Sequence, residues 1–578
     1  MLRILAGKIG EYKKETILTP LFMLGEVAME CLIPAVMAML IDRMNSESLE
    51  PVLKYGSLLL VLALLSLWCG ASSARYGAKA STGFAKNLRR DMFYKVQEFD
   101  FADIDYFSSS SLVTRMTNDI SQIQMAFQMM IRMAVRTPLM LLFSIIMAFR
   151  INRKMSLIFF GIVPVLGVGL IMIFKISHPI FRRIFKRYDA LNNSVQENVA
   201  GIRIVKSFVR EDYEIQKFNK ASEEVRSDFV KAELVLAWNN PLQLFCIKLA
   251  KELICYLGAL TIINTAATEL TTGQLSSLIS YGIQILTAMM MFSMVFIQMA
   301  FSAEAATRIC EVLTHESKLV SPENGLKEVK DGSIRFDHVT FRYNEHSQRP
   351  ALEDIDLDIK SGQTIGILGS TGSSKTTLIQ LISRLYDVSE GAVYVGGEDV
   401  RNYDLKTLRD AVSVVLQKNV LFKGSIKENL RWGNKNATDE EIIEACRLAQ
   451  AEEFIEQMPD KYDTMLTQGG TNVSGGQKQR LCIARALLKK PKVLILDDST
   501  SAVDTKTDAL IRTGFKEYIP ETTKIIIAQR VSSVEESDQI IILDGGKIVE
   551  QGNHEELMKL GGIYKEIYDS QTKGKEEN

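Results

Sequence analysis

Long apolar runs alternate with polar segments over the first 313 residues of the chain. Each run is about 20 residues long, which lets a single helix cross a hydrocarbon core of about 30 Å. A helix in a soluble core is rarely apolar on all of its faces over such a length. The pattern therefore predicts six membrane-spanning helices, at roughly 18–41, 56–74, 133–149, 155–175, 240–264 and 276–302.

Two of the segments between these spans are about 60 residues long and rich in charge. They follow the second and the fourth span, so both lie on the same side of the membrane. Arg89 and Arg90 in the first segment and Arg183 in the second place that side in the cytoplasm, where basic loops are retained. The basic N-terminal segment lacks the apolar core and cleavage site of a removable signal, and we interpret it as a helix on the cytoplasmic face.

Several charged side chains fall inside the predicted spans. Glu26 and Glu30 lie one turn apart on one face of the first span, and Lys248 and Glu252 are spaced likewise in the fifth. Charges inside a membrane are costly and are candidates for function. They could form structural pairs or face water in an inward cavity. The sharper hypothesis is that Glu26 and Glu30 line the substrate pathway and favour cationic cargo.

Methionine gathers in the sixth predicted span, where Met290 and Met294 belong to a run of five. Flexible thioether side chains suit an adaptable apolar surface, although helix packing explains the run about as well. We include Met290 and Met294 among the candidate pathway residues.

From about residue 333 the pattern changes to short β-rich runs that alternate with helical ones, as in an α/β domain. The predicted strand TIGILG is followed by a loop and then by the apolar helix TLIQLISRL. The loop and the start of the helix comprise Gly369, Ser370, Thr371, Gly372, Ser373, Ser374, Lys375, Thr376 and Thr377. Backbone N–H groups of such a loop cradle phosphates, the lysine meets the β/γ-phosphates and the first threonine ligates Mg²⁺.

One residue departs from this phosphate-loop pattern. Ser374 stands where the pattern has its final glycine before the lysine. A serine adds a Cβ atom where the backbone approaches phosphate, so a strained geometry is expected there.

Two further motifs complete the soluble half. The run KVLILDD is a buried apolar strand that ends in acid, and Asp497 suits a Mg²⁺ ligand. Between the two strands, Ser474, Gly475, Gly476 and Gln477 open a helix, whose positive dipole end offers a second surface for phosphate. One domain thus carries two phosphate-binding surfaces, which it could use on two different nucleotides.

Composition separates the same two halves. The chain has a net charge of −1 and a mean hydropathy of +0.06, but residues 1–313 carry +7 and the remainder −8. Of 24 methionines, 21 precede residue 313. Seven scattered cysteines form no CxxC pair and are interpreted as reduced thiols. The predicted organisation is a membrane domain over 1–313, a linker over 314–332 and a soluble domain over 333–578.

The phosphate loop, then VSGGQ, then the LILDD strand form an ordered set that resembles ATP-binding cassette (ABC) proteins. Together with six preceding spans, the set resembles half-transporters of type IV, B-subfamily-like ABC exporters of the multidrug type. The resemblance implies an all-α six-helix transmembrane domain followed by an α/β phosphate-loop nucleotide-binding domain, with ATP and Mg²⁺ bound. It also implies a multi-pass protein of the cell membrane whose nucleotide-binding domain is cytoplasmic.

The resemblance assigns roles to further residues. Tyr343 would stack on adenine, and Gln417 would sense Mg²⁺ and the γ-phosphate. Residues 474–477 form the signature that completes the ATP site of the opposite subunit, and Asp504, in STSAVD, is the D-loop aspartate at the dimer interface. Coupling helices would lie near 101–109 and 210–218, and the TQGG stretch at 467–470 would contact them.

Two departures from the family pattern fall in one half-site. The family has glutamate after Asp497, the base that activates water, and here it is Asp498. The switch histidine is replaced by Gln529. A carboxylate one methylene shorter is misplaced by about 1 Å, which can cost about 10²-fold in rate.

These departures resemble heterodimeric bacterial exporters with one degenerate and one competent ATP site. The chain would supply the degenerate site and lend its intact signature to a non-identical partner. A homodimer with two slow sites is the alternative. We expect an ATPase that exports amphipathic small molecules or drugs and has no nucleic-acid partner. A lipid or peptide exporter, or an ATP-sensing subunit that does not pump, are the competing functions.

Overall fold

The computed structural model describes residues 1–44, 49–344, 347, 349–498 and 503–576. The chain folds into two compact units. Unit 1 comprises Met1–Gln97 and Ser109–His315, and unit 2 comprises Glu98–Ser108 and Glu316–Asn578. The short segment Glu98–Ser108 therefore belongs to the second unit, although it lies within the first third of the sequence.

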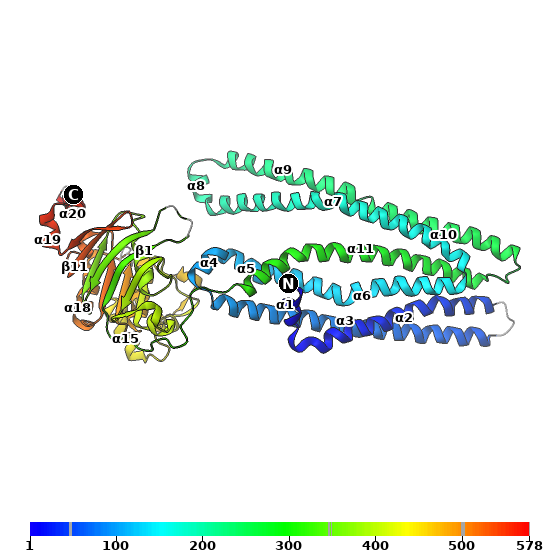
Figure 1. Ribbon diagram of the computed structural model, residues 1–578, viewed down its shortest axis with the longest axis horizontal. Helices are drawn as coiled ribbons and strands as arrows, with labels where there is room; N and C mark the ends of the chain where they lie inside the picture. The colour runs from blue at the N-terminus through cyan, green and yellow to red at the C-terminus, as the bar shows by residue number, and fades with distance from the viewer. Residues whose placement is uncertain (45–48, 345–346, 348, 499–502, 577–578) are drawn as a thin grey trace. The chain divides into compact units, whose positions relative to one another are not determined.

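Unit 1 is helical, and its long helices run side by side (Figure 1). Its α-helices are α1 (Leu2–Gly7), α2 (Lys13–Arg43), α3 (Glu50–Gln97), α5 (Ser109–Thr114), α6 (Ile120–Ile151), α7 (Arg153–Ala200), α8 (Ile202–Ser207), α9 (Glu211–Leu236), α10 (Asn239–Asn264) and α11 (Thr272–Thr314). A 3₁₀ turn at Gly10–Tyr12 precedes α2, and a π-helical turn at Arg115–Asp119 precedes α6.

Within the described residues, five helical segments are long and apolar enough to cross a membrane. They are Gly10–Arg43, Glu50–Gln97, Ser109–Ile151, Arg153–Phe181 and Thr272–Thr314. The remaining predicted span, 240–264, coincides with helix α10, which carries Lys248, Lys251 and Glu252. Its crossing of the membrane therefore stays a prediction.

The range 210–218, where the second coupling helix is expected, holds no separate short helix, and all of it lies within the described residues. A short helix does occur at 101–107, as α4 (Phe101–Phe107) of unit 2. The range 210–218, however, forms the start of the long helix α9, and the short helix of that loop is α8, at Ile202–Ser207. Acidic residues at 211, 212 and 214 favour the first turn of a helix, which explains where α9 begins.

Within the described residues, unit 2 contains three sheets. A six-stranded sheet has the order β12–β11–β3–β10–β9–β6, with strands β12 (Lys547–Gly552), β11 (Gln539–Asp544), β3 (Thr364–Leu368), β10 (Thr523–Ile527), β9 (Val493–Asp497) and β6 (Val412–Val415). A four-stranded antiparallel sheet has the order β2–β1–β4–β5, with β2 (Leu352–Ile359), β1 (Ile334–Phe341), β4 (Glu390–Val395) and β5 (Glu398–Asp399). Strands β7 (Gly424–Ser425) and β8 (Met465–Leu466) form a small pair.

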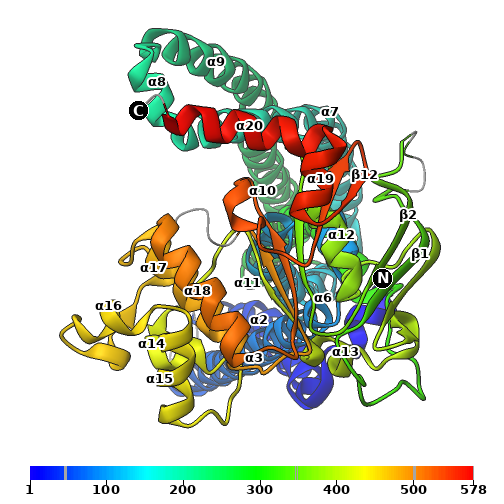
Figure 2. The same cartoon turned by 90° about the vertical axis from the view of Figure 1, so that its left-hand side faces the viewer.

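Helices cover the six-stranded sheet and form a separate helical layer beside it (Figure 2). They are α12 (Lys375–Ile382), α13 (Leu405–Ala411), α14 (Ile426–Leu430), α15 (Asp439–Leu448), α16 (Glu452–Glu456), α17 (Gly475–Leu487), α18 (Thr505–Tyr518), α19 (His554–Leu560) and α20 (Ile563–Glu576). Strands β9 and β10 are buried along their whole length, as expected for parallel strands covered on both faces. All seven cysteines, each within the described residues, are free thiols.

The sheet topology determines where functional residues gather. Strands β3, β10, β9 and β6 are parallel neighbours, so their carboxyl ends meet at one edge of the sheet. The segments that follow them are the phosphate loop, the segment with Gln529, the pair Asp497–Asp498 and the segment with Gln417. Ligands of open α/β sheets bind at this edge, so four separate sequence motifs meet at one site.

Candidate ATP site

The phosphate loop connects β3 to α12 through residues whose backbone is left-handed. An added Cβ at Gly369 would lie 2.1 Å from the carbonyl oxygen of Leu543, so glycine is required there. Gly372 has φ 85° and open space around it, which leaves its backbone accessible to an anion. Ser374 adopts φ 71° and ψ 24°, a conformation that costs a non-glycine residue roughly 1–2 kcal/mol. The expected strain at Ser374 is thus present in the backbone.

Lys375 and Thr376 stand at the first turn of α12. The Lys375 Nζ donates to the carbonyl oxygens of Gly369 and Ser370, both at 2.8 Å. The Thr376 hydroxyl donates to Oδ2 of Asp497 at 3.0 Å. Hydroxyl and carboxylate oxygens are the ligands that Mg²⁺ prefers, so this pair fits the ion that accompanies a nucleotide triphosphate.

Burial changes the titration of the charged groups at this edge. It lowers the pKa of the Lys375 ammonium, an effect that Asp497 and Asp498 oppose. It raises the pKa of Asp497, whose hydrogen bond from Thr376 acts in the other direction. A phosphate would offset the charge of Lys375, and a divalent cation would offset the charges of Asp497 and Asp498.

Asp498 lies directly against the two glutamines that sequence reasoning assigned to the same site. Gln529 donates from Nε2 to Oδ2 of Asp498 at 2.9 Å, and the side chain of Gln417 also hydrogen-bonds Asp498. Burial raises the pKa of Asp498, and both hydrogen bonds oppose that rise. Asp498 has φ 48°, a second non-glycine residue in the left-handed region.

The cavity over the phosphate loop has a volume of about 710 Å³. Its lining includes the loop from Gly369 to Thr377, the two aspartates 497 and 498, Gln417 and Gln529. Ile563 and Ile567 of the C-terminal helix α20 also line it. Sequence reasoning did not assign α20 to this site, because nothing in its sequence resembles a nucleotide motif.

Tyr343 is 53% exposed, so one face of its ring is open to a planar ligand. Its hydroxyl lies 2.9 Å from Oγ1 of Thr377, on helix α12, which follows the phosphate loop. The ring of Tyr386 packs edge-on against Tyr343 with centroids 5.3 Å apart. These contacts hold Tyr343 in place with its ring about half exposed.

Tyr386 also binds helix α4, and sequence reasoning missed this residue. Its hydroxyl donates to Asp105 Oδ2 at 2.7 Å, and its ring meets that of Phe101 with centroids 6.1 Å apart. Burial and the carboxylate of Asp105 raise the pKa of Tyr386. Asp100, the N-cap of α4, makes a further contact within unit 2: its carboxylate accepts a hydrogen bond from the Ser317 hydroxyl at 2.9 Å. One tyrosine therefore connects α4 with Tyr343.

The signature opens helix α17 with complete capping. Ser474 accepts from the backbone N–H of Gln477 at 3.2 Å, and Gln477 accepts from the N–H of Ser474 at 2.9 Å. Ser474 and Gly475 are exposed, so the positive end of the helix dipole faces solvent. Gly476 follows within the same first turn.

Asp504 begins helix α18 as its N-cap. Its carboxylate accepts from the backbone N–H of Thr507 at 2.9 Å and from the hydroxyl of the same residue at 2.7 Å. Residues 499–502 of the expected D-loop lie outside the described residues.

In the membrane unit, Glu26 and Glu30 share one cation that sequence reasoning overlooked. Arg136 donates to Oε1 of Glu26 at 2.6 Å and to both carboxylate oxygens of Glu30 at 2.8 Å. Glu26 is only 9% exposed, and its Oε2 is buried with no hydrogen-bond partner among the described residues. The signal was available, since Arg136 is a charged residue inside the predicted third span.

An apolar cavity of about 570 Å³ lies between α6, α7 and α11. Its lining is almost wholly hydrocarbon and includes Met289, Phe292 and Phe296, with Lys175 as the charged residue in the lining. Met290 and Met294 belong to the same helix but are not among the lining residues. Lys248 and Glu252 of α10 are also outside it.

Comparison with known proteins agrees with this arrangement. Residues 16–289 match the ABC transporter transmembrane region, and residues 352–501 match the ABC transporter family of ATP-binding domains. An uncharacterized ABC transporter ATP-binding protein of Bacillus subtilis, YfiB, is 36% identical over 552 residues, 95% of each chain. The ATP-dependent lipid A-core flippase of Desulfotalea psychrophila is 31% identical over 488 residues, 84% of each chain.

A bacterial Atm1-family ABC exporter with ATP bound has the same fold. The TM-score is 0.83 at 22% identity, over 97% of this chain and 98% of that one. Both domains, in the predicted order, are therefore those of this architecture. The chain belongs to the ABC transporter family as an ATP-driven exporter half-transporter, a multi-pass membrane protein that joins one transmembrane region to one ATP-hydrolysing domain.

Proposed function

We propose that the chain is the catalytically weaker subunit of a heterodimeric exporter. In the dimer, each ATP would lie between the phosphate loop of one subunit and the signature of the other. Asp498 and Gln529 would then weaken the site built on this chain's phosphate loop. Residues 474–477 would complete a competent site on a partner that carries glutamate and histidine at the equivalent positions.

The observation that supports this proposal is the direct contact between the two unusual residues. Gln529 donates to Asp498 at 2.9 Å, so the two residues that differ from the family pattern would affect the same part of the ATP site. A neutral amide can hydrogen-bond phosphate but cannot carry the charge of an imidazolium. The shorter carboxylate reaches less far toward an attacking water, which lowers the rate of proton transfer.

ATP would be held by the groups already in place. Tyr343 would stack on the base, Lys375 would meet the β/γ-phosphates, and Thr376, Asp497 and Gln417 would hold Mg²⁺. The ion would neutralise charge on the phosphates during phosphoryl transfer. Closure of the two nucleotide-binding domains would move α4 through Tyr386 and so switch the membrane pathway.

The heterodimer proposal is tested by pairing. The chain is purified alone and with a candidate non-identical half-transporter, and ATP turnover is measured in lipid nanodiscs. We expect the pair to exceed the sum of the separate subunits by about tenfold or more, since a competent site needs both chains. Equal turnover per subunit in the two preparations would favour a homodimer.

We further propose amphipathic small molecules or drugs as cargo. The cavity between α6, α7 and α11 supports this, because its hydrocarbon lining and single lysine suit a molecule with an apolar body and a polar end. Phe292→Ala should change the affinity for such cargo, whereas Phe160→Ala, an exposed phenylalanine of α7 outside the lining, should not. Substrate-stimulated ATP turnover measures both.

Lipid export is the second candidate, favoured by the relative named as a lipid A-core flippase. Vesicles with the reconstituted pair distinguish the two, because a labelled lipid and a soluble amphipathic dye can be followed in the same preparation. Uphill, ATP-dependent movement of either one would exclude an ATP-sensing subunit that does not pump.

The role of Glu26 and Glu30 is tested through their shared cation. If they favour cationic cargo, Glu26→Gln with Glu30→Gln should abolish transport of cations. That double variant also leaves the half-buried Arg136 without a carboxylate partner, which is itself destabilising. Adding Arg136→Met removes the unpaired charge. A triple variant that is stable and still transports cations would refute the pathway hypothesis.

A further inference from the structure

The segment that carries Gln529 is held by the C-terminal helix. Gln571 of α20 donates from Nε2 to the carbonyl oxygen of Gln529 at 2.9 Å and accepts at Oε1 from the N–H of Val531, also at 2.9 Å. A single amide side chain thus pairs with the backbone of two residues of the segment, as a neighbouring strand would. This orientation of the amide is the one that makes both hydrogen bonds.

Helix α20 is itself fixed in unit 2. The carboxylate of Glu550, on β12, accepts from the backbone N–H groups of Ile563 and Tyr564, the first two residues of the helix. Tyr564 is fully buried, and its hydroxyl lies 2.6 Å from Nδ1 of His554. Figure 2 shows α20 following α19 at the edge of the sheet that carries β12. A helix held in this way can position what it contacts.

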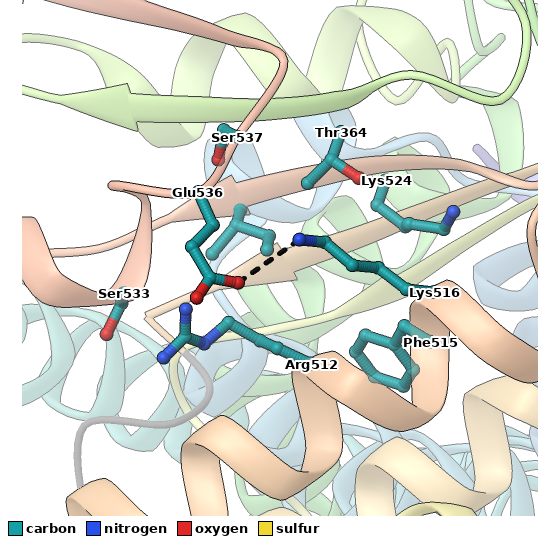
Figure 3. A pocket seen from close by; sticks show the side chains of 9 residues that line it. Thr364, Arg512, Phe515, Lys516, Lys524, Ser533, Glu536 and Ser537 are labelled. Atoms are coloured by element: carbon teal, nitrogen blue, oxygen red, sulfur yellow. Dashed lines mark hydrogen bonds and ion pairs between the residues drawn. The ribbon is translucent and has the colours of Figure 1, made fainter. Parts of the chain in front are cut away.

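The other end of the same segment is anchored to α18. The hydroxyl of Ser533 donates to Oδ2 of Asp508 at 3.1 Å, and Arg512 forms an ion pair with that carboxylate at 3.4 Å. Figure 3 shows Arg512 and Lys516 of α18 pointing toward Ser533 and Glu536, with the Lys516–Glu536 ion pair drawn. Residues 529–533 are therefore held between two helices, at the start by Gln571 and at the end by Asp508.

We propose that Gln571 is a positioning residue of the ATP site. By fixing the backbone on both sides of residue 530, it directs the side chain of Gln529 to Asp498, which it contacts at 2.9 Å. The C-terminal helix is then part of the hydrolytic machinery, and anything that displaces α20 releases residues 529–533. This inference does not depend on whether the partner subunit is identical.

The test compares three substitutions in the full chain in lipid nanodiscs. Gln571→Met keeps the length of the side chain and removes both hydrogen bonds. Gln571→Glu keeps the acceptor for Val531 and loses the donor to Gln529. Thr572→Ala is the matched control, because the Thr572 hydroxyl bonds only the carbonyl of Tyr568 in its own helix among the described residues.

Amide hydrogen exchange gives the first readout. Without its acceptor, the N–H of Val531 should exchange about tenfold faster in Gln571→Met than in the unsubstituted chain, measured on peptides that cover 528–534. Gln571→Glu should be intermediate, and Thr572→Ala should leave the exchange unchanged. Unchanged exchange in Gln571→Met would overturn the proposal.

ATP turnover gives the second readout. We expect Gln571→Met to lower kcat by about threefold to tenfold with the KM for ATP within twofold, since position is lost while the phosphate loop is untouched. Partial recovery in Gln571→Glu would identify the hydrogen bond as the cause. Faster exchange with normal kcat, a raised KM at normal kcat, or an increased kcat would each contradict a positioning role. If turnover is below detection, the exchange result decides.

Discussion

The nucleotide-binding domain presents two phosphate-binding surfaces that differ in regularity. The signature at 474–477 is an unstrained helix start whose first N–H groups are capped reciprocally by Ser474 and Gln477. The phosphate-loop side has two non-glycine residues in the left-handed region, Ser374 and Asp498. The backbone strain of this domain's two phosphate-binding surfaces therefore falls on one of them, and the other is regular.

The difference has an energetic side. Reciprocal capping stabilises a helix start by about 1 kcal/mol. Each left-handed residue on the other surface costs about 1–3 kcal/mol, which persists where the surrounding structure determines the conformation. A regular surface beside a strained one is the asymmetry that the proposed heterodimer would require, with the regular surface used by the partner subunit.

The largest expected effect comes from the regular surface. Gly476→Glu places a side chain and a negative charge at the helix N-terminus, where the partner's nucleotide would bind. We expect at least about 10²-fold loss of ATP turnover in the assembled pair, because phosphate stabilisation at the competent site is removed. The matched change on the other surface, Lys375→Ala, should cost less than about tenfold. A reversed order of the two losses would refute the assignment.

Restoring the usual residues should raise activity on the strained surface. Asp498→Glu with Gln529→His lengthens the base and returns an imidazole, and we expect about tenfold faster hydrolysis at this site. Turnover is measured in a pair whose competent site is disabled by a substitution in the partner. Each single change should give less than the double change, since the two side chains are in contact. No gain from the double variant would count against the interpretation of Asp498.

A smaller effect is expected where α4 meets the domain. Tyr386→Phe removes the hydrogen bond to Asp105 and keeps the ring against Tyr343. Loss of a partly exposed bond of this kind weakens the contact by about 1 kcal/mol, or about fivefold. We expect a fall in substrate transported per ATP hydrolysed, with ATP binding unchanged. Tyr518→Phe, an exposed tyrosine of α18, is the control.

The smallest expected effect comes from the backbone strain at Ser374. Ser374→Gly removes the Cβ from a left-handed residue and should raise the melting temperature of the nucleotide-free chain by a few degrees, about 1 kcal/mol. Ser374→Ala keeps the Cβ and should give no such gain. Equal melting temperatures for the glycine and alanine variants would mean that the backbone of Ser374 stores no strain.

Local patterns predicted most of the nucleotide site. Three motifs were recognisable from the elements beside them. The phosphate loop follows a predicted strand, Asp497 ends another, and residues 474–477 open a predicted helix. The structure brings Gln417, Asp498 and Gln529 together at one sheet edge. The sheet topology explains why, since these motifs follow the carboxyl ends of parallel strands that lie side by side in the order β3–β10–β9–β6.

Local sequence patterns could not predict contacts between residues that are far apart in the chain. Tyr386 and Asp105 are 281 residues apart, and Gln571 and Gln529 are 42 apart, in segments with no motif. Arg136 was visible as a charge in a span, but its partners lie on another helix. The range 210–218, expected from the family resemblance to hold the second coupling helix, is the start of the long helix α9, and the short helix α8 precedes it.

The proposal that this chain is the weaker half of a heterodimer is tested by steady-state ATP hydrolysis of the purified chain alone in lipid nanodiscs. An aspartate base and a glutamine switch in both sites of a homodimer predict turnover near 0.1 s⁻¹, about 10²-fold below the ~10 s⁻¹ typical of enzymes, and no cooperativity in ATP. Cooperative hydrolysis at about 10 s⁻¹ without any partner would contradict the account.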